Sequence, residues 1–496
     1  MRSSFTRSLL WLSAVFIAVF IGEFVFEWIR LGKPDVASMS WADANNAKLV
    51  DVLSPMARAY NNILAMLIAT IGLAIPLTAN MHTPKLIEMF FRDRLNQLVL
   101  MFMAFGAANV LWVDYIVGPK FAPVWAFRIA IFGSLAGWAI LVPYFFYVVR
   151  FLDPSNILKR LEEETTGVVE AVERGEQDPN TAQTIVHERL YQIGTIILKS
   201  LDRADRGVAL EGIWSLKKII DHHGERKERM PARWFEVDRG DFVGLSAEAI
   251  DILNEEKTWF EMKALTQMFL AYQHALAKTS DVISSISDAN RVIATNANKR
   301  GDAKTVNLAI KHFNNFLRES IKKKDNHSIY DVFYEYRLLA KELRDRPDVL
   351  LEVAKYFRYY GDLARHSGLE FVYQLAAFDL GYIVRRAYEV ESPNARAVLD
   401  KALGIPHAGK DKPLALVVKA KLIVGGFFLE KKLEAEAALV RENLRDVPAD
   451  AIAAAEHDLL AAERSFFEVT DRQVNLEYLE PSRRDHVKKF VASFAG

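Results

Sequence analysis

The stretch that decides the fold reads Asn61-Asn62-Ile-Leu-Ala-Met-Leu-Ile-Ala-Thr70-Ile-Gly72-Leu-Ala-Ile-Pro76-Leu-Thr78-Ala-Asn80 and contains no charged side chain. An α-helix needs roughly 20 apolar residues to cross a hydrocarbon core of about 30 Å. The run Ala59–Asn80, which contains this stretch, therefore has the length and composition of a membrane span. Three other runs are also long and apolar enough to cross the membrane, although each contains at least one ionisable residue: Ser8–Ile29, Leu95–Gly118 and Phe121–Val149. The sequence therefore predicts a transmembrane domain of four helices over residues 1–150.

The rest of the chain, from residue 151 onward, is densely charged. Over all 496 residues, 63 basic side chains balance 63 acidic ones, and there is no cysteine. A balanced charge argues against a nucleic-acid binder that relies on a basic surface. The lack of cysteine excludes disulfides, thiolate metal sites, iron–sulfur clusters and thiol nucleophiles.

Basic residues near the span ends indicate the topology. They fall into three groups, before span one, between spans two and three, and after span four: Arg2 and Arg7; Lys85, Arg92 and Arg94; Arg150, Lys159 and Arg160. Cytoplasmic loops carry an excess of lysine and arginine, and all three groups lie on one side if both termini are cytoplasmic. The first run is longer than the apolar core of a signal peptide, so we expect it to be retained. The pattern predicts a multi-pass protein of the bacterial inner membrane with both termini inside.

Four ionisable residues within the spans are candidates for a polar vestibule or an ion path. Glu23 and Glu27 lie one helical turn apart near the outer end of span one. Asp114 and Arg128 reach similar depth if spans three and four form an antiparallel hairpin, and an ion pair between them is expected. Charges inside a membrane are costly and often functional. The alternative is that the glutamates sit at the headgroups while Asp114 and Arg128 neutralise each other.

Small residues and a proline mark two further features of the spans. Pro76 frees the carbonyl of Gly72, so Gly72, Pro76 and Thr78 are candidates for a hinge or a pore lining, or for a plain packing kink. In span four, Gly133 and Gly137 lie on one helix face. Glycines spaced in this way let another backbone approach closely, within the bundle or between protomers.

The junction between spans two and three carries a family resemblance. It reads His82-Thr-Pro-Lys-Leu-Ile-Glu-Met-Phe-Phe-Arg92-Asp93-Arg94-Leu-Asn-Gln97, and Asn62–Leu111 resembles the bacterial predicted membrane proteins grouped as domain of unknown function 2254. That family has a similar Phe-x-Arg-Asp-Arg-x-x-Gln junction and a cytoplasmic extension, but no established activity. After the spans the chain departs from the family pattern at Leu201–Trp214. Asp93 is placed to cap the start of span three. Arg92 and Arg94 can contact lipid phosphates, and such contacts would either anchor the span or take part in gating.

From Asp153 onward apolar residues recur at spacings of three and four, which is typical of amphipathic helices. Ten are expected after the helix that starts near Asp153: Thr181–Ser200, Ala209–His222, Ser246–Ala297, Lys304–Lys323, Ser328–Arg344, Pro347–His366, Gly368–Val390, Asn394–Leu403, Pro413–Arg445 and Asp450–Thr470. Only Trp234–Val237 and Asp241–Val243 resemble short extended pieces. The predicted fold is all-α, with a helical linker or subdomain over 151–240 and a bundle or solenoid over 241–496.

Motifs that would carry chemistry are scarce. Asp221-His222-His223 offers ligand types, but adjacent histidines on a helix point about 100° apart and no second pair follows at zinc spacing. Gly404–Lys410 resembles a phosphate loop only superficially. The run Lys322–Lys324, preceded by Arg318, reads as a solvated helix end or a membrane-phosphate contact. We expect no catalytic residues, no metal, no cofactor and no enzymatic activity.

Two functions remain open. The first is a homo-oligomer that conducts or transports ions, with span two or four lining the path and the cytoplasmic domain regulating or assembling it. Acidic residues at the outer end would favour cations. The second is a membrane-anchored helical scaffold or signalling protein that does not conduct and binds a protein partner through its cytoplasmic helices. Both place the chain in the lipid bilayer, and neither involves nucleic acid.

Overall fold

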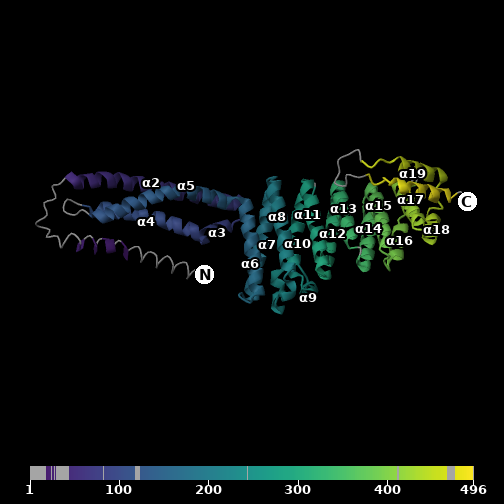
Figure 1. The fold of residues 1–496 in the computed structure, drawn as a ribbon, viewed down its shortest axis with the longest axis horizontal. Coiled ribbons are helices and arrows are strands. Elements are labelled where there is room, and N and C mark those ends of the chain that lie inside the picture. The colour runs from purple at the N-terminus through teal and green to yellow at the C-terminus, as the bar shows by residue number, and fades with distance from the viewer. Residues whose placement is uncertain are drawn as a thin grey trace. The chain divides into compact units, whose positions relative to one another are not determined.

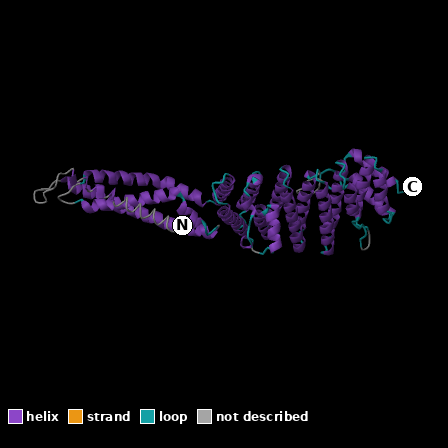
Figure 2. Cartoon of the chain, turned by 90° about the horizontal axis from the view of Figure 1, so that it is seen from below, coloured by secondary structure: helices purple, strands orange, loops and turns teal. Residues whose placement is uncertain are grey.

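The computed structural model of the chain describes residues 44–81, 83–117, 123–242, 244–276, 278–343, 345–409, 413–465 and 475–494, together with parts of 18–29. These residues form helices without any strand, apart from an isolated bridge between Ala408 and Pro413 (Figure 2). The predicted all-α class is confirmed. The chain divides into two compact units, Met1–Ile157 and Leu158–Gly496, which we call the membrane bundle and the helical array. The predicted division near residue 240 stays a prediction.

Besides helical positions between 18 and 29, the described part of the membrane bundle includes three long helices and one short one, labelled in Figure 1: α2 (Ala44–Met81), α3 (Leu86–Arg92), α4 (Arg94–Ile116) and α5 (Val124–Leu152). Three stretches are long and apolar enough to cross a membrane, namely Asp51–Met81, Arg94–Ile116 and Trp125–Leu152. They match the predicted spans two, three and four. The described residues thus hold three candidate spans rather than four, because most of the predicted first span lies outside them.

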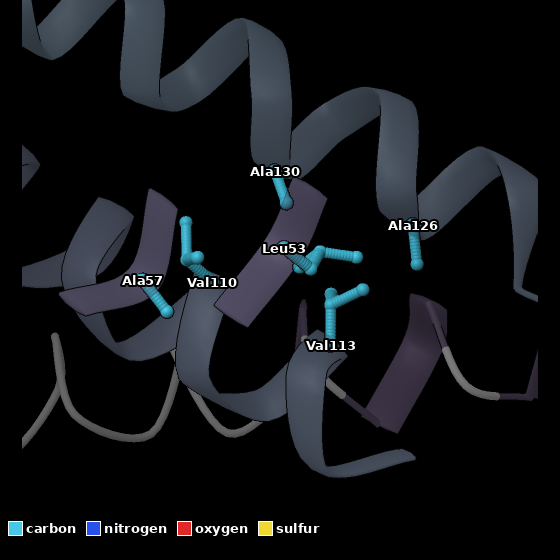
Figure 3. Close-up of a cluster of buried hydrophobic side chains, with 6 residues drawn as sticks. All are labelled: Leu53, Ala57, Val110, Val113, Ala126 and Ala130. Atoms are coloured by element: carbon cyan, nitrogen blue, oxygen red, sulfur yellow. The ribbon is translucent and has the colours of Figure 1, made fainter. Parts of the chain in front are cut away.

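A small apolar core holds the three long helices together (Figure 3). Leu53 of α2 and Val110 and Val113 of α4 are fully buried, and Ala126 of α5 is 1% exposed. Small side chains from α5 let that helix approach α2 and α4 closely. Large apolar side chains also point outward, such as Phe132 with 79% of its surface exposed. Helices that are apolar inside and outside suit a lipid environment, whereas a water-soluble bundle would carry polar outer faces.

The helical array is built from two layers of paired helices. One layer contains α7 (Pro179–Asp202), α10 (Trp259–Ala275), α12 (Ala303–Lys323), α14 (Pro347–His366) and α16 (Ala395–Leu403). The other contains α8 (Arg206–Gly224), α11 (Ser280–Lys299), α13 (Asn326–Glu342), α15 (Glu370–Glu389) and α17 (Ala415–Glu430). Each helix packs on its sequence neighbour and on the next member of its layer. This arrangement is typical of a solenoid.

The remaining array helices flank these layers: α6 (Pro154–Glu173), α9 (Ala247–Glu256), α18 (Glu434–Asn443), α19 (Ala449–Ala461) and α20 (Pro481–Ala492). Aspartate side chains cap several starts, as where Asp302 accepts a hydrogen bond from the Thr305 backbone at the start of α12. At the far end, α20 lies against two consecutive glycines of α17, Gly425 and Gly426. Side chains of α20 occupy the space that a Cβ at either glycine would need.

Four predictions for this region were wrong. The long helix Ser246–Ala297 is three helices, because Lys257 adopts a left-handed conformation (φ 56°) that ends α9. The predicted helix Pro413–Arg445 is likewise broken, with Lys432 at φ 58° between α17 and α18. The pieces expected to be extended are 3-10 turns, η2 (Ala232–Phe235) and η3 (Arg239–Asp241). The predicted helix Asp450–Thr470 ends at Ala461 as α19, and residues 466–474 lie outside the described part.

Candidate functional site

The junction between α3 and α4 is a hydrogen-bonded elbow centred on Asp93. Its Oδ1 accepts hydrogen bonds from the Asn96 backbone N–H at 3.1 Å and from the Tyr147 hydroxyl at 2.8 Å. The first bond caps α4 as the sequence predicted, and the second ties the start of α4 to α5. A capping carboxylate also interacts favourably with the positive end of the helix dipole.

Amide side chains complete the same elbow. Nδ2 of Asn96 donates to the Phe90 carbonyl at 3.2 Å, and Nε2 of Gln97 donates to the Phe91 carbonyl at 2.7 Å. These carbonyls belong to the last turn of α3, where helix carbonyls lack intrahelical partners. The Phe-x-Arg-Asp-Arg-x-x-Gln pattern therefore encodes a turn whose side chains hydrogen-bond to its free backbone N–H and carbonyl groups. Its two arginines, Arg92 and Arg94, lie exposed at the surface, Arg92 with an ion pair to Glu88 at 2.6 Å.

Three of the candidate vestibule residues, Glu23, Asp114 and Arg128, each contact a different partner. Oε2 of Glu23 accepts a hydrogen bond from Asn109 Nδ2 at 2.8 Å, which links the first predicted span to α4. Oδ1 of Asp114 accepts from the Ser54 hydroxyl at 2.7 Å, while the Arg128 guanidinium lies 5.0 Å from the centre of the Trp125 ring.

The prediction of an ion pair between Asp114 and Arg128 is therefore wrong. Asp114 is hydrogen-bonded to Ser54 of α2, and Arg128 lies against Trp125 of its own helix. Glu27, the fourth member of the candidate set, lies outside the described residues.

The centre of the bundle is filled by a tyrosine. Tyr60 of α2 is fully buried, and its hydroxyl donates to the sulfur of Met103 at 3.4 Å. A Cβ at Gly106 would lie 2.6 Å from the Tyr60 oxygen, and a Cβ at Gly137 would overlap the same oxygen. Neither position has room for a Cβ, so the two glycines create the space that the ring occupies. By contrast, Gly133 has no neighbouring atom within 4 Å of a built Cβ.

The candidate hinge in α2 lies on the outer face of that helix. The helix continues through Pro76 to Met81. Gly72 and Pro76 are exposed, and no atom lies within 4 Å of a Cβ built on Gly72. The Thr78 hydroxyl donates to the Ala74 carbonyl of its own helix at 2.9 Å. Gly72 and Pro76 therefore face away from the filled centre of the bundle, while Thr78 is half-buried.

The array contains a buried polar network that sequence reasoning missed. His223 of α8 and Glu261 of α10 are both fully buried, with His223 Nδ1 3.0 Å from Glu261 Oε1. The Trp234 indole N–H lies 3.0 Å from His223 Nε2. An indole nitrogen can only donate, so Nε2 accepts and Nδ1 carries the proton that is donated to Glu261. The Phe260 ring stacks on the imidazole at 4.0 Å.

Lys227 completes the network from a loop. Its Nζ lies 3.3 Å from Glu261 Oε1 and 2.8 Å from Asp302 Oδ2, the carboxylate that caps α12. Burial raises the pKa of Glu261, but the attractions of Lys227 and His223 outweigh it and bring that pKa from 4.5 to about 2. Burial lowers the pKa of Lys227, yet Glu261 and Asp302 raise it overall. Glu261 therefore stays ionised in the interior.

The network joins four segments rather than forming a reactive centre. Its two central side chains have no exposed surface, so a substrate cannot reach them. It fixes the loop of Lys227 and Trp234 to α8, α10 and α12. The neighbours that looked like metal ligands are engaged elsewhere: Asp221 pairs with Lys217 at 2.9 Å, and His222 lies 3.3 Å from Glu170. Among the described residues no group of three such side chains could hold a metal ion.

The membrane part of the chain is similar to a family of predicted membrane proteins. Residues 2–196 match the family model described as "Predicted membrane protein (DUF2254)". This match confirms the resemblance found at the α3–α4 junction and extends it to α6 and much of α7. It stops before the stretch at Leu201–Trp214, where the sequence departs from the family pattern.

Two further comparisons add little. No curated protein matches the chain. Among solved structures, a "Circular tandem repeat protein with novel repeat topology and enhanced subunit contact surfaces" aligns over 91% of this chain and 96% of its own, with 12% identity and a TM-score of 0.25. A likeness at that level supports no inference about the fold or the function.

Proposed function

We propose that this protein, whose residues 2–196 match a family of predicted membrane proteins, is a membrane-anchored helical scaffold that binds a protein partner through its array. The observation that carries the proposal is the filled centre of the bundle. Tyr60 occupies the space left by Gly106 and Gly137, and the apolar cluster around Leu53 closes the bundle beside it. A bundle packed in this way suits an anchor better than a conduit.

The stacked helix pairs of the array offer a surface for a protein partner. Stacked helix pairs present long continuous surfaces, and proteins of this kind commonly use them for binding. The buried Glu261 network adds rigidity, because it ties a loop to three helices through charged hydrogen bonds. A rigid surface loses less entropy on binding than one that must first be ordered.

We infer that Ser8–Ile29 forms a fourth span, with both termini in the cytoplasm of a bacterial cell. The inference is supported by helical conformation at described positions between 18 and 29 and by the hydrogen bond from Asn109 to Glu23. The basic residues flanking the spans support the same orientation. It would place the array in the cytoplasm.

Partner capture from membranes tests the scaffold. The full chain and a version ending at Ile157 would carry the same affinity tag, be cross-linked in cells and be purified in parallel. We expect a specific protein that co-purifies with the full chain and is absent with the truncated one. Recovery of self-association alone, or of the same proteins with both versions, would refute the scaffold.

A conducting assembly of several copies is the second candidate. One observation favours it: the open positions Gly72 and Gly133 lie on outer faces of α2 and α5, where another backbone can approach. Any pathway would then run between copies. Ion flux into liposomes that contain the full chain, under voltage or a pH gradient, tests this candidate. Flux that Gly133→Leu abolishes would favour it over the scaffold, and absence of flux would remove it.

A further inference from the structure

A pocket between α12 and α14 gathers basic and aromatic side chains. It has a volume of about 600 Å³ and is lined by Lys311 and Arg318 of α12 and by Lys355, Tyr356, Tyr359 and Tyr360 of α14. Lys311 and Arg318 lie seven residues apart, which places them on one face of α12. The size falls within the usual range for sites that bind small molecules.

The three cations of the pocket have no carboxylate partner among the described residues. Elsewhere in the array arginines are paired, as where Arg291 lies 2.6 Å from Glu335 and 3.1 Å from Glu342. The chain is neutral as a whole, so three cations that no carboxylate neutralises, gathered around one pocket, are a local excess of positive charge. Such clusters attract anions.

An acidic side chain beside the pocket is already hydrogen-bonded. Glu352, one turn before the lining residues of α14, accepts a hydrogen bond from the Tyr356 hydroxyl at 2.8 Å. The Arg318 charge lies beside the Tyr360 hydroxyl, where it opposes the rise in pKa that burial causes in that tyrosine. Tyr360 is 2% exposed, so its buried side chain holds the Arg318 guanidinium in place at the edge of the pocket.

The aromatic side of the pocket suits a flat ring. Tyr359 is 57% exposed, although large aromatic side chains are usually buried. An exposed tyrosine face can stack on a nucleobase, and the amides of Asn314 and Asn315, which also line the pocket, can donate to or accept from its edge. Guanidinium and ammonium groups in turn bind phosphate oxygens.

We propose that the pocket between α12 and α14 binds a phosphorylated small molecule that carries a planar ring, of the nucleotide class. The cations of Lys311, Arg318 and Lys355 contact the phosphate groups, and Tyr359 stacks on the ring. The site does not depend on the scaffold function, since it is formed by the array alone and requires no protein partner.

The experiment uses the purified full chain in detergent and four probes: ADP, GDP, pyrophosphate and adenosine. Isothermal titration calorimetry would measure each affinity. We expect ADP or GDP to bind more tightly than both pyrophosphate, which lacks the ring, and adenosine, which lacks the phosphates. If neither nucleotide binds, the proposal is overturned. If pyrophosphate binds as tightly as the nucleotides, or anionic phospholipid vesicles displace them, the ring requirement is overturned and a phosphate or lipid-headgroup site replaces it.

Variants locate the site. Arg318→Gln and Lys355→Gln should each weaken nucleotide binding by about tenfold or more, since each removes a charged hydrogen bond to phosphate. Tyr359→Leu should weaken ADP or GDP but leave pyrophosphate unchanged. The control is Lys323→Gln, which removes an exposed charge from the same helix outside the pocket. Equal losses in the control and the pocket variants would overturn the assignment. Far-UV circular dichroism would show that each variant is folded.

Discussion

Replacing Glu261 with glutamine tests the buried network in the array. The change keeps the shape of the side chain and its ability to accept from His223, but it removes the charge that faces Lys227. The pKa of Glu261 is lowered from 4.5 to about 2, which corresponds to about 3 kcal/mol of stability at neutral pH. We therefore expect Glu261→Gln to lower the free energy of unfolding by about 3 kcal/mol at pH 7.

The pH dependence of this cost provides a second test. Because the folded pKa lies below the ordinary one, the contribution of Glu261 is full above about pH 4.5 and is lost as the pH falls toward 2. Between pH 4.5 and 3.5 the difference between wild type and variant should shrink by about 1 kcal/mol. The glutamine variant lacks this dependence, so other groups that titrate in the same range cancel in the comparison.

The assay is urea unfolding of the array, residues 158–496, followed by tryptophan fluorescence. Trp234 donates to His223 and Trp259 packs against it, so the signal reports on the network itself. The control is Asp400→Asn, which breaks an ion pair with Arg396 whose side chains are more than half exposed and should cost less than about 1 kcal/mol. A cost no larger than the control, or one that does not change between pH 7 and 3.5, would refute the reasoning.

Three further changes have calculable outcomes. Gly137→Leu should destabilise the bundle by about 1–3 kcal/mol because it meets the Tyr60 ring, whereas Gly133→Leu should have little effect; thermal unfolding in detergent compares the two. Burial lowers the pKa of His312 to about 4, so the array should lose up to about 3 kcal/mol as the pH falls from 6.5 to 4, and His312→Gln should remove that loss in urea titrations. Lys421→Met should lower the free energy of unfolding by about 1–3 kcal/mol, since the Lys421 Nζ donates to the Ile405 carbonyl and to Asn443 at 2.7 Å each. Faster amide hydrogen exchange at the end of α16 would show this loss of stability.

Much of the fold could be predicted because its signals are local. Hydropathy located three spans, and periodicity gave α14 its observed bounds, Pro347–His366. The breaks inside predicted helices could not be located, because Lys257 and Lys432 adopt left-handed conformations that usually signal glycine. The reverse occurs in α17, where Gly425 and Gly426 stay helical since α20, about sixty residues later, packs on them.

The candidate sites depended on contacts between distant segments. Asp114 bonds Ser54, sixty residues earlier, and no spacing within spans three and four could reveal that partner. Glu261 sits between aromatic and apolar neighbours and pairs with Lys227, which belongs to a loop outside the predicted helices. The available signal was a glutamate between Phe260 and Met262, because a buried charge needs a partner. Asp93 was predictable as a cap because its partner lies three residues away.

Single-particle imaging of the full chain in lipid nanodiscs decides between a membrane anchor and a conducting assembly. We expect a bundle whose centre is occupied by the Tyr60 side chain, with α2 and α5 facing lipid and no water-filled axis between copies. A ring of copies around an axis lined by the Gly72 face of α2 or the Gly133 face of α5 would contradict it and establish the conducting assembly instead.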